Sequence, residues 1–112
     1  MSARFVQDGK SIDYTPAAAV TAGDVVVQGD LIGIANLDIA ANQLGTLAIE
    51  GVFDFPKATG TSTGIAAGAV CYWDVADQQA KTDSETGANK KLGKCIRAAV
   101  DADTTVRIKL DQ

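Results

Sequence analysis

A short β-type pattern occurs twice in this chain, and it restricts the possible folds more than any other feature. The first copy, residues 21–35, reads TAGDVVVQGDLIGIA: a small-residue turn, a β-branched run, a second turn and another apolar run. The pattern starts again at Ile65 with IAAGAVCYWDV and resumes, beyond a polar stretch, with LGKCIRAAV. Apolar runs of this kind bounded by Gly and Asp are typical of strands joined by turns. The sequence therefore predicts an all-β protein made of two similar β-units.

The two copies correspond segment by segment. Ala22-Gly23-Asp24 matches Ala67-Gly68-Ala69, and the expected strand at residues 25–28 matches the one at residues 70–74. Further along, residues 31–34 match residues 92–96, and residues 46–49 match residues 105–110. A solenoid needs three or more repeats, so two units favour a small pseudo-symmetric barrel or sandwich.

The clearest alternation of apolar and polar residues lies at residues 44–55. It predicts one long half-buried strand, bent or bulged at Gly51 and ended by Pro56, which lacks a ladder donor. Residues 57–64, KATGTSTG, have the composition of a linker. Residues 77–91 are polar and are expected to form an exposed loop, whose role the sequence does not indicate.

Length and charge limit the classes of protein to consider. With 112 residues we expect an N-terminal arm at residues 1–15 and a single β domain at residues 16–112. The net charge of −4 argues against nonspecific nucleic-acid binding. Residues 81–112 carry seven basic and five acidic side chains, whereas residues 1–80 carry three and nine. Such asymmetry favours docking of copies on each other or on a partner, although ordinary outward-facing strand positions give the same pattern.

No group of residues indicates catalysis, a metal or a cofactor. The chain lacks histidine and CxxC pairs, and Cys71 and Cys95 lie in apolar runs where we expect them to pack as small hydrophobes. The P-loop-like Asp8-Gly9-Lys10-Ser11 has Arg4 where the motif requires glycine. The remaining carboxylates stand in or beside turns, where aspartate caps backbone amides; they are Asp24, Asp30, Asp74, Asp77, Asp101 and Asp103.

No apolar segment has the length of a signal peptide or a membrane helix, so we expect a soluble protein kept in a reducing cytoplasm. Two groups of residues are candidates for contacts with other chains. Tyr72 and Trp73 are adjacent, so a strand points one into the core and leaves the other for an oligomer, rim or ligand contact. In the arm, the candidates for contact with a partner are Arg4, Phe5, Ile12 and Tyr14.

The order of several motifs resembles the small capsid cement, or head decoration, proteins of tailed bacteriophages and prophages. The most specific blocks are EGVFDFPKA at residues 50–58 and AVCYWD at residues 69–74. Around them stand FVQDGK at residues 5–10, TAGDVVV at 21–27, IGIA at 32–35, LGKCI at 92–96 and TTVRIKL at 104–110. The resemblance covers nearly the whole chain.

The resemblance implies a non-enzymatic virion protein that binds the outside of an expanded capsid, often as a trimer, and braces it against DNA pressure. Its partners would be the major capsid protein and further copies of itself, with no direct nucleic acid or membrane contact. It also implies a β-tulip or small-barrel fold with the arm laid on the shell. Some relatives are labelled phage recombinases, which these residues do not support. The residues alone leave open a small-molecule or glycan-binding β module using Tyr72 or Trp73, or a carboxylate-only enzyme.

Overall fold

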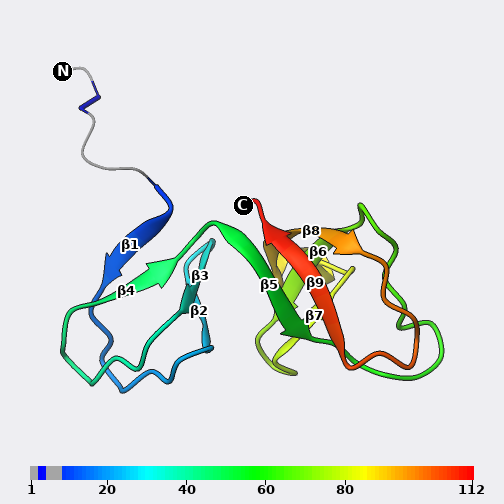
Figure 1. Cartoon of the computed structure of the whole chain (residues 1–112), viewed down its shortest axis with the longest axis horizontal. Helices are drawn as coiled ribbons and strands as arrows, with labels where there is room; N and C mark the ends of the chain where they lie inside the picture. The colour runs from blue at the N-terminus through cyan, green and yellow to red at the C-terminus, as the bar shows by residue number, and fades with distance from the viewer. Residues whose placement is uncertain (1–2, 5–8) are drawn as a thin grey trace. The chain divides into compact units, whose positions relative to one another are not determined.

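The computed structural model describes residues 3–4 and 9–112 of the chain (Figure 1). Phe5 and the Asp8 end of the P-loop-like segment therefore lie outside the described residues. The strands are β1 (Ser11–Tyr14), β2 (Val25–Gln28), β3 (Leu31–Ala35), β4 (Gly45–Ala48), β5 (Gly51–Pro56), β6 (Val70–Asp74), β7 (Gln79–Lys81), β8 (Lys90–Arg97) and β9 (Thr105–Leu110), with a 3-10 turn, η1 (Glu85–Gly87). The prediction of an all-β protein is confirmed. In the described part of the chain, no helix has the length and apolarity needed to cross a membrane.

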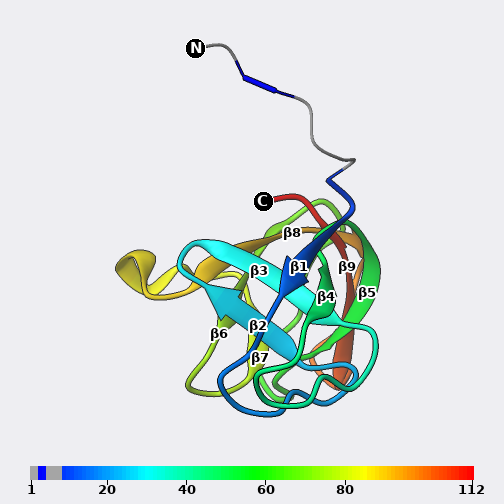
Figure 2. The same cartoon turned by 90° about the vertical axis from the view of Figure 1, so that its left-hand side faces the viewer.

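Two antiparallel sheets make up the fold, and they have the same topology. The first sheet has the order β1-β4-β3-β2 (Figure 2), and the second has the order β5-β9-β8-β6-β7. Without β7 the second order is β5-β9-β8-β6. It equals the first order when β5 takes the place of β1, β9 of β4, β8 of β3 and β6 of β2. The predicted duplication is therefore confirmed. β7 is an addition, built from the polar stretch that the first copy lacks.

Backbone hydrogen bonds repeat along with the strands. The amide of Gly23 donates to Ala35 O and the amide of Gly68 donates to Cys95 O, both at 2.6 Å. These two glycines have φ of +91° and +86°, a left-handed conformation that side chains with a Cβ rarely adopt. Isolated antiparallel bridges also correspond, one joining Val20 to Ile39 and the other joining Ile65 to Ala99. The small-residue turn that begins each copy is thus a structural requirement of the unit.

The structure divides into two compact units, which are Met1–Val26 with Gly33–Glu50, and Val27–Ile32 with Gly51–Gln112. In the first unit, a buried cluster of Ala35, Ile39 and Leu47 is flanked by half-buried Ile12, Tyr14, Val20 and Val26. The second unit buries large side chains from one face of its sheet, namely Phe55, Trp73, Leu92, Val106, Ile108 and Leu110. The expectation of an arm at residues 1–15 before a single domain stays a prediction.

The two cysteines lie in the core of the second unit, as predicted. Cys71 is fully buried and Cys95 is 1% exposed, and neither forms a disulfide. Burial raises the pKa of the Cys71 thiol to about 11, because the thiolate would lose its hydration, and the nearby Cys95 adds to the effect. Both residues therefore behave as small hydrophobes.

The prediction of one long strand at residues 44–55 is wrong. β4 ends at Ala48 and β5 begins at Gly51, and the two strands belong to different sheets. Gly51 has φ of +124°, so the backbone leaves the extended conformation there. The alternation continues through this break because both strands keep one buried face, and alternation alone cannot distinguish one strand from two.

Residues 57–64 are also not the loose linker that their composition suggests. Lys57 is only 4% exposed, and its ammonium donates to the carbonyl oxygens of Ala58, at 2.7 Å, and Asp103, at 3.0 Å. The carboxylate of Asp101 accepts hydrogen bonds from the amides of Ser62 and Gly64. This loop is therefore attached to the β8–β9 connection by a buried cation and a carboxylate.

Candidate interaction surfaces

The arm residues proposed to contact a partner fall into two groups. Arg4 is exposed, and Phe5 is outside the described residues. Ile12 and Tyr14 belong to β1, where they pack against the buried cluster of the first unit. β1 pairs with β4 along residues 11–14 and is the edge strand of its sheet. Ile12 and Tyr14 thus have a packing role within the unit, and partner contact by the four residues stays a prediction.

Tyr72 and Trp73 lie on opposite faces of β6. Trp73 is 2% exposed, and its ring packs against Phe55 with the centroids 6.0 Å apart. Its Nε1–H is buried without a hydrogen-bond partner. Tyr72 is half-buried on the other face, opposite Lys81 of β7 and Lys91 of β8. Of the two, Tyr72 is the residue whose position leaves it accessible to another molecule.

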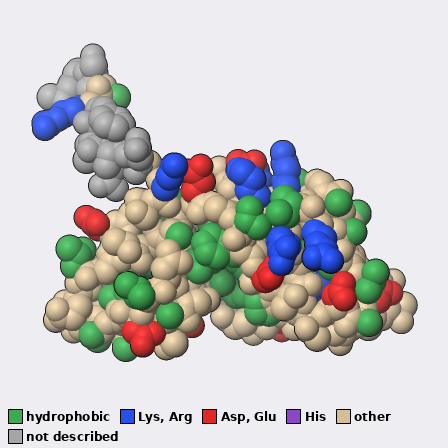
Figure 3. Space-filling view, viewed as in Figure 1, with side chains coloured by type: hydrophobic (Ala, Val, Ile, Leu, Met, Phe, Trp, Pro, Cys, Tyr) green, Lys and Arg blue, Asp and Glu red, His purple; other side chains and the backbone are tan. Residues whose placement is uncertain are grey.

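The solvent face of the second sheet gathers basic side chains that are scattered along the sequence. One row across four strands contains Val52, Lys109, Lys94 and Val70, in that order. In the neighbouring row, Arg107 lies opposite both Asp54 and Arg97. Figure 3 shows Lys and Arg side chains close together over the β8 and β9 region. We call the group Lys91, Lys94, Arg97, Arg107 and Lys109 the basic face.

One carboxylate neutralises part of the basic face. Arg107 donates from Nε and Nη2 to the two oxygens of Asp54, at 2.9 and 3.2 Å. The hydrogen bond from Arg107 holds the pKa of Asp54 below its ordinary value. Elsewhere in the described residues, no carboxylate forms an ion pair with Lys91, Lys94, Arg97 or Lys109. The basic face therefore keeps a positive charge.

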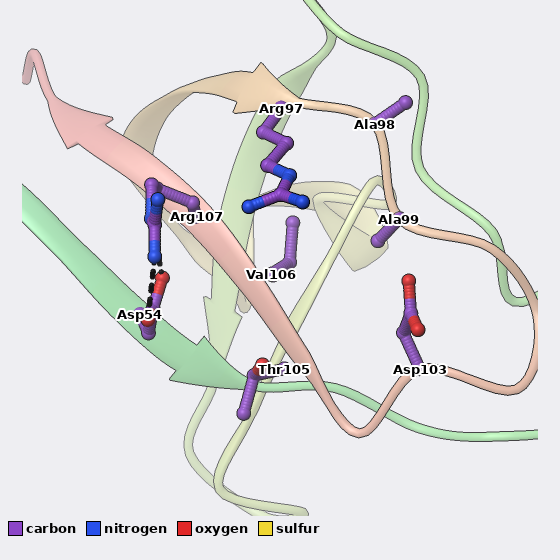
Figure 4. A pocket seen from close by; sticks show the side chains of 8 residues that line it. All are labelled: Asp54, Arg97, Ala98, Ala99, Asp103, Thr105, Val106 and Arg107. Carbon is purple, nitrogen blue, oxygen red and sulfur yellow. Dashed lines mark hydrogen bonds and ion pairs between the residues drawn. The ribbon is translucent and has the colours of Figure 1, made fainter.

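A hollow of roughly 250 Å³ lies beside this face (Figure 4). The Arg97 guanidinium points into it over Val106, while Arg107 is joined to Asp54 at its edge. Asp103 lines the opposite side, and its carboxylate accepts a hydrogen bond from the amide of Val100. Arg97 is thus the cation of this hollow that has no ion-pair partner among the described residues.

The first unit carries a hollow of similar size, roughly 240 Å³. Its rim includes Leu37 and Leu44, which are 76% and 71% exposed, together with Asp38. A third hollow, roughly 200 Å³, lies between the Lys57 loop and β7. All three are smaller than the roughly 300–1,000 Å³ usual for ligand pockets. Neither Tyr72 nor Trp73 lines any of them.

The carboxylates singled out in the sequence are held in turns or ion pairs. The carboxylate of Asp24 accepts from the amide of Thr21, and that of Asp38 from the amide of Ala22. Asp74 is buried and pairs with Lys81, which also binds Asp77. Among residues 3–4 and 9–112, no cluster of three or more His, Cys, Asp or Glu side chains is arranged to hold a metal.

We expect Asp74 to contribute to the pH dependence of stability. The hydrogen bond from Lys81 lowers the pKa of Asp74 in the folded state, so its stabilising effect is complete above the unfolded value of about 3.9. The effect is lost as pH falls through the folded pKa. Asp74→Asn should therefore be less stable at pH 7 and should lose less stability between about pH 5 and pH 2. Urea unfolding across this range measures the difference, with Asp13→Asn on the exposed face of β1 as the control outside this ion-pair cluster.

Some of the positions on the basic face can be recognised from the sequence. The alternation of Val106, Ile108 and Leu110 with Arg107 and Lys109 predicts that the two basic residues face outward, and both are exposed. The sequence did not show that Lys94 and Arg97 stand directly opposite them, because that depends on the register of β8 against β9. Basic and apolar residues alternate at residues 105–110, but Lys94 and Arg97 are three positions apart and share a face only because the register shifts between Cys95 and Arg97.

The family comparison concerns almost the entire chain. A family model described as phage cement protein matches residues 6–110. No curated protein and no solved structure gives a significant match.

Proposed function

This chain belongs to the phage cement protein family, and from that premise we propose that it coats the outer surface of a phage capsid and stabilises the shell, as a trimer. Family membership gives it a structural, capsid-associated role in the virion. We further propose that this protein is made in the host cytoplasm, binds the major capsid protein and has no catalytic activity.

The observation that carries the proposal is the match of the family over residues 6–110, which includes both β-units. The apolar side chains exposed on the surface also support the proposed function. Large apolar side chains are exposed in both units; they are Leu37, Leu44, Val52, Val70, Val75, Ile96 and Val100. Exposed apolar side chains close to charged ones are typical of protein interaction sites. A small-molecule or glycan-binding role has no comparable support, because the hollows are small and lack Tyr72 and Trp73.

The N-terminal segment is proposed to contact the shell through Arg4 and Phe5, with Ile12 and Tyr14 fixing where the segment leaves the first unit. A segment that precedes an edge strand is well placed to add to a partner's sheet. Many copies on one lattice would strengthen a weak individual contact.

Deletion of residues 1–8 is expected to abolish capsid binding and to leave the fold intact. The deletion stops before Lys10, whose carbonyl oxygen accepts a hydrogen bond from Ile49, and before β1. The measurement is co-sedimentation with heads lacking the protein, together with a thermal melt of the truncated chain.

Deletion of residues 1–14 is the informative comparison, because it also removes β1 and the packing of Ile12 and Tyr14. We expect that longer deletion to lower the melting temperature. Normal coating by the chain lacking residues 1–8 would exclude the proposed role of the arm. Failure of the intact protein to bind or stabilise any head would refute the capsid function itself.

A further inference from the structure

Two of these hollows occupy corresponding places in the two β-units but differ in the side chains that line them. They are the hollow with Leu37 on its rim in the first unit and the hollow with Arg97 in the second unit, called the first and the second hollow below. In the duplicated topology, residues 37–39 of the first unit match residues 97–99 of the second, because Ile39 and Ala99 form the corresponding bridges. Leu37 therefore corresponds to Arg97, and Asp38 to Ala98. The hollow of the first unit has Leu37, Leu44 and Asp38 on its rim and no cation among its described lining residues, whereas the hollow of the second unit is lined by Arg97 and Arg107 together with Asp54 and Asp103. Among the described residues, the hollow of the second unit therefore offers a guanidinium without an ion pair, that of Arg97, and the hollow of the first unit offers a carboxylate without one, that of Asp38.

The first unit presents its carboxylates close to this rim. The amides of Thr21 and Ala22, which are neighbours in the chain, donate to Asp24 and Asp38 respectively, so these two carboxylates lie at the same end of the unit. No ion pair joins either of them to a cation in the described residues. The unit carries five acidic and two basic residues, a net charge of −3.

The basic face of the second unit is unfavourable in an isolated molecule. Lys94 of β8 lies directly opposite Lys109 of the adjacent strand β9, and Arg97 lies opposite Arg107. Like charges at directly opposed positions destabilise a sheet. Asp54 forms an ion pair with Arg107 and also attracts Arg97 at longer range. An acidic partner placed over Lys94, Arg97 and Lys109 would relieve this repulsion.

We propose that copies of this chain associate head to tail, with the rim residues Leu37 and Asp38 of one copy, and Asp24 at the same end of the unit, docked on the basic face of the next copy at Arg97. The partner carboxylates pair with Arg97 and Lys94, and Leu37 packs against exposed Ile96 and the exposed Ala98 of the second hollow. Such an interface joins two different surfaces, so a rotation that closes gives a ring. This interface deepens the proposed function, on which it rests, by specifying how a trimer forms.

A second copy is favoured as the occupant because the complementary charges are present in the chain itself. The acidic rim and the basic face occur once per copy, so each copy can offer one of each to its neighbours. A capsid surface on the basic face is the competing occupant, and the experiment distinguishes the two.

The test is a charge exchange in the full-length protein. The variants are Arg97→Glu, Asp38→Lys and the double variant with both changes, and sedimentation equilibrium at low and moderate salt gives the association constant. Each single variant places like charges in the interface, so we expect association to weaken about tenfold or more. The double variant restores opposite charges and should recover most of the loss. Moderate salt should weaken the wild type.

Fold controls are needed because Asp38 also accepts the Ala22 amide. Leu37→Ser changes a 76% exposed side chain in the same rim and should also weaken association, with an unchanged thermal melt. A monomeric wild type, an unchanged association constant in the single variants, or a double variant as weak as the singles would each overturn the proposal.

Capsid binding, measured separately on the same variants, keeps the two hypotheses apart. If Arg97→Glu loses head binding while its self-association is unchanged, the basic face contacts the capsid and the head-to-tail interface is wrong, although the capsid function stands. If the charge exchange behaves as expected but no variant, including the wild type, binds heads, the interface stands and the capsid function is wrong.

Discussion

Gly93→Ala is expected to unfold the second unit, with a loss of more than about 4 kcal/mol in the free energy of unfolding. A Cβ at Gly93 would lie 1.9 Å from the carbonyl oxygen of Lys109 and 2.7 Å from the amide nitrogen of Asp111. Both atoms belong to the backbone, so no side-chain rotation relieves the overlap. The φ of +156° adds strain. The β8–β9 ladder would have to separate, and this ladder lies in the middle of the sheet.

Two glycine variants are matched controls for Gly93→Ala. Gly68→Ala also has positive φ, at +86°, but a Cβ there meets nothing within 4 Å, so only conformational strain of about 1–2 kcal/mol is expected. Gly33 is the counterpart of Gly93 in the first unit, and the three atoms nearest to its added Cβ belong to the Leu47 side chain, beginning with Cβ at 2.7 Å. We expect an intermediate loss there. Chemical denaturation followed by far-UV circular dichroism, which reports the strands of both units, ranks the three, and equal losses would contradict the steric explanation.

Lys57→Met is expected to cost about 3 kcal/mol of stability. The substitution keeps the aliphatic stem but removes the ammonium that donates to Ala58 O and Asp103 O. At 4% exposure of the residue, water has little access to replace these bonds, and the carbonyl oxygens would be left without their charged donor. The loop at residues 57–64 should also become more accessible to protease.

Lys94→Met is the control for Lys57→Met, because it makes the same chemical change on the exposed face of the same unit. Its expected effect on stability is within about 0.5 kcal/mol. If the two variants unfold at the same denaturant concentration, the buried ammonium does not hold the loop. Limited proteolysis at low enzyme concentration then tells whether the loop has opened.

The strand pattern of this protein could be predicted because it depends on neighbouring residues. β-branched runs such as Val25-Val26-Val27 favour extended backbone, and Gly23 and Gly68 provide the positive φ that each unit needs in its first turn. The continuous apolar run of β3 indicated burial on both faces, and four of its five residues are buried. The family blocks at residues 50–58 and 69–74 are likewise local, and the chain does belong to that family.

The candidate surfaces could not be predicted in the same way, because they depend on contacts between distant segments. Lys94 and Lys109 are opposed only through the register of β8 and β9. The hydrogen bond from the Lys57 ammonium to Asp103 O joins residues 46 positions apart. At Gly51 the chain passes from the first sheet to the second, although the alternation of apolar and polar residues continues. Side-chain alternation fixes which residues face the core, but it is the same for every even shift of register. Hydrogen bonding between strands and packing of the buried face of each sheet select one register, and that selection places the charges and hollows on the surface.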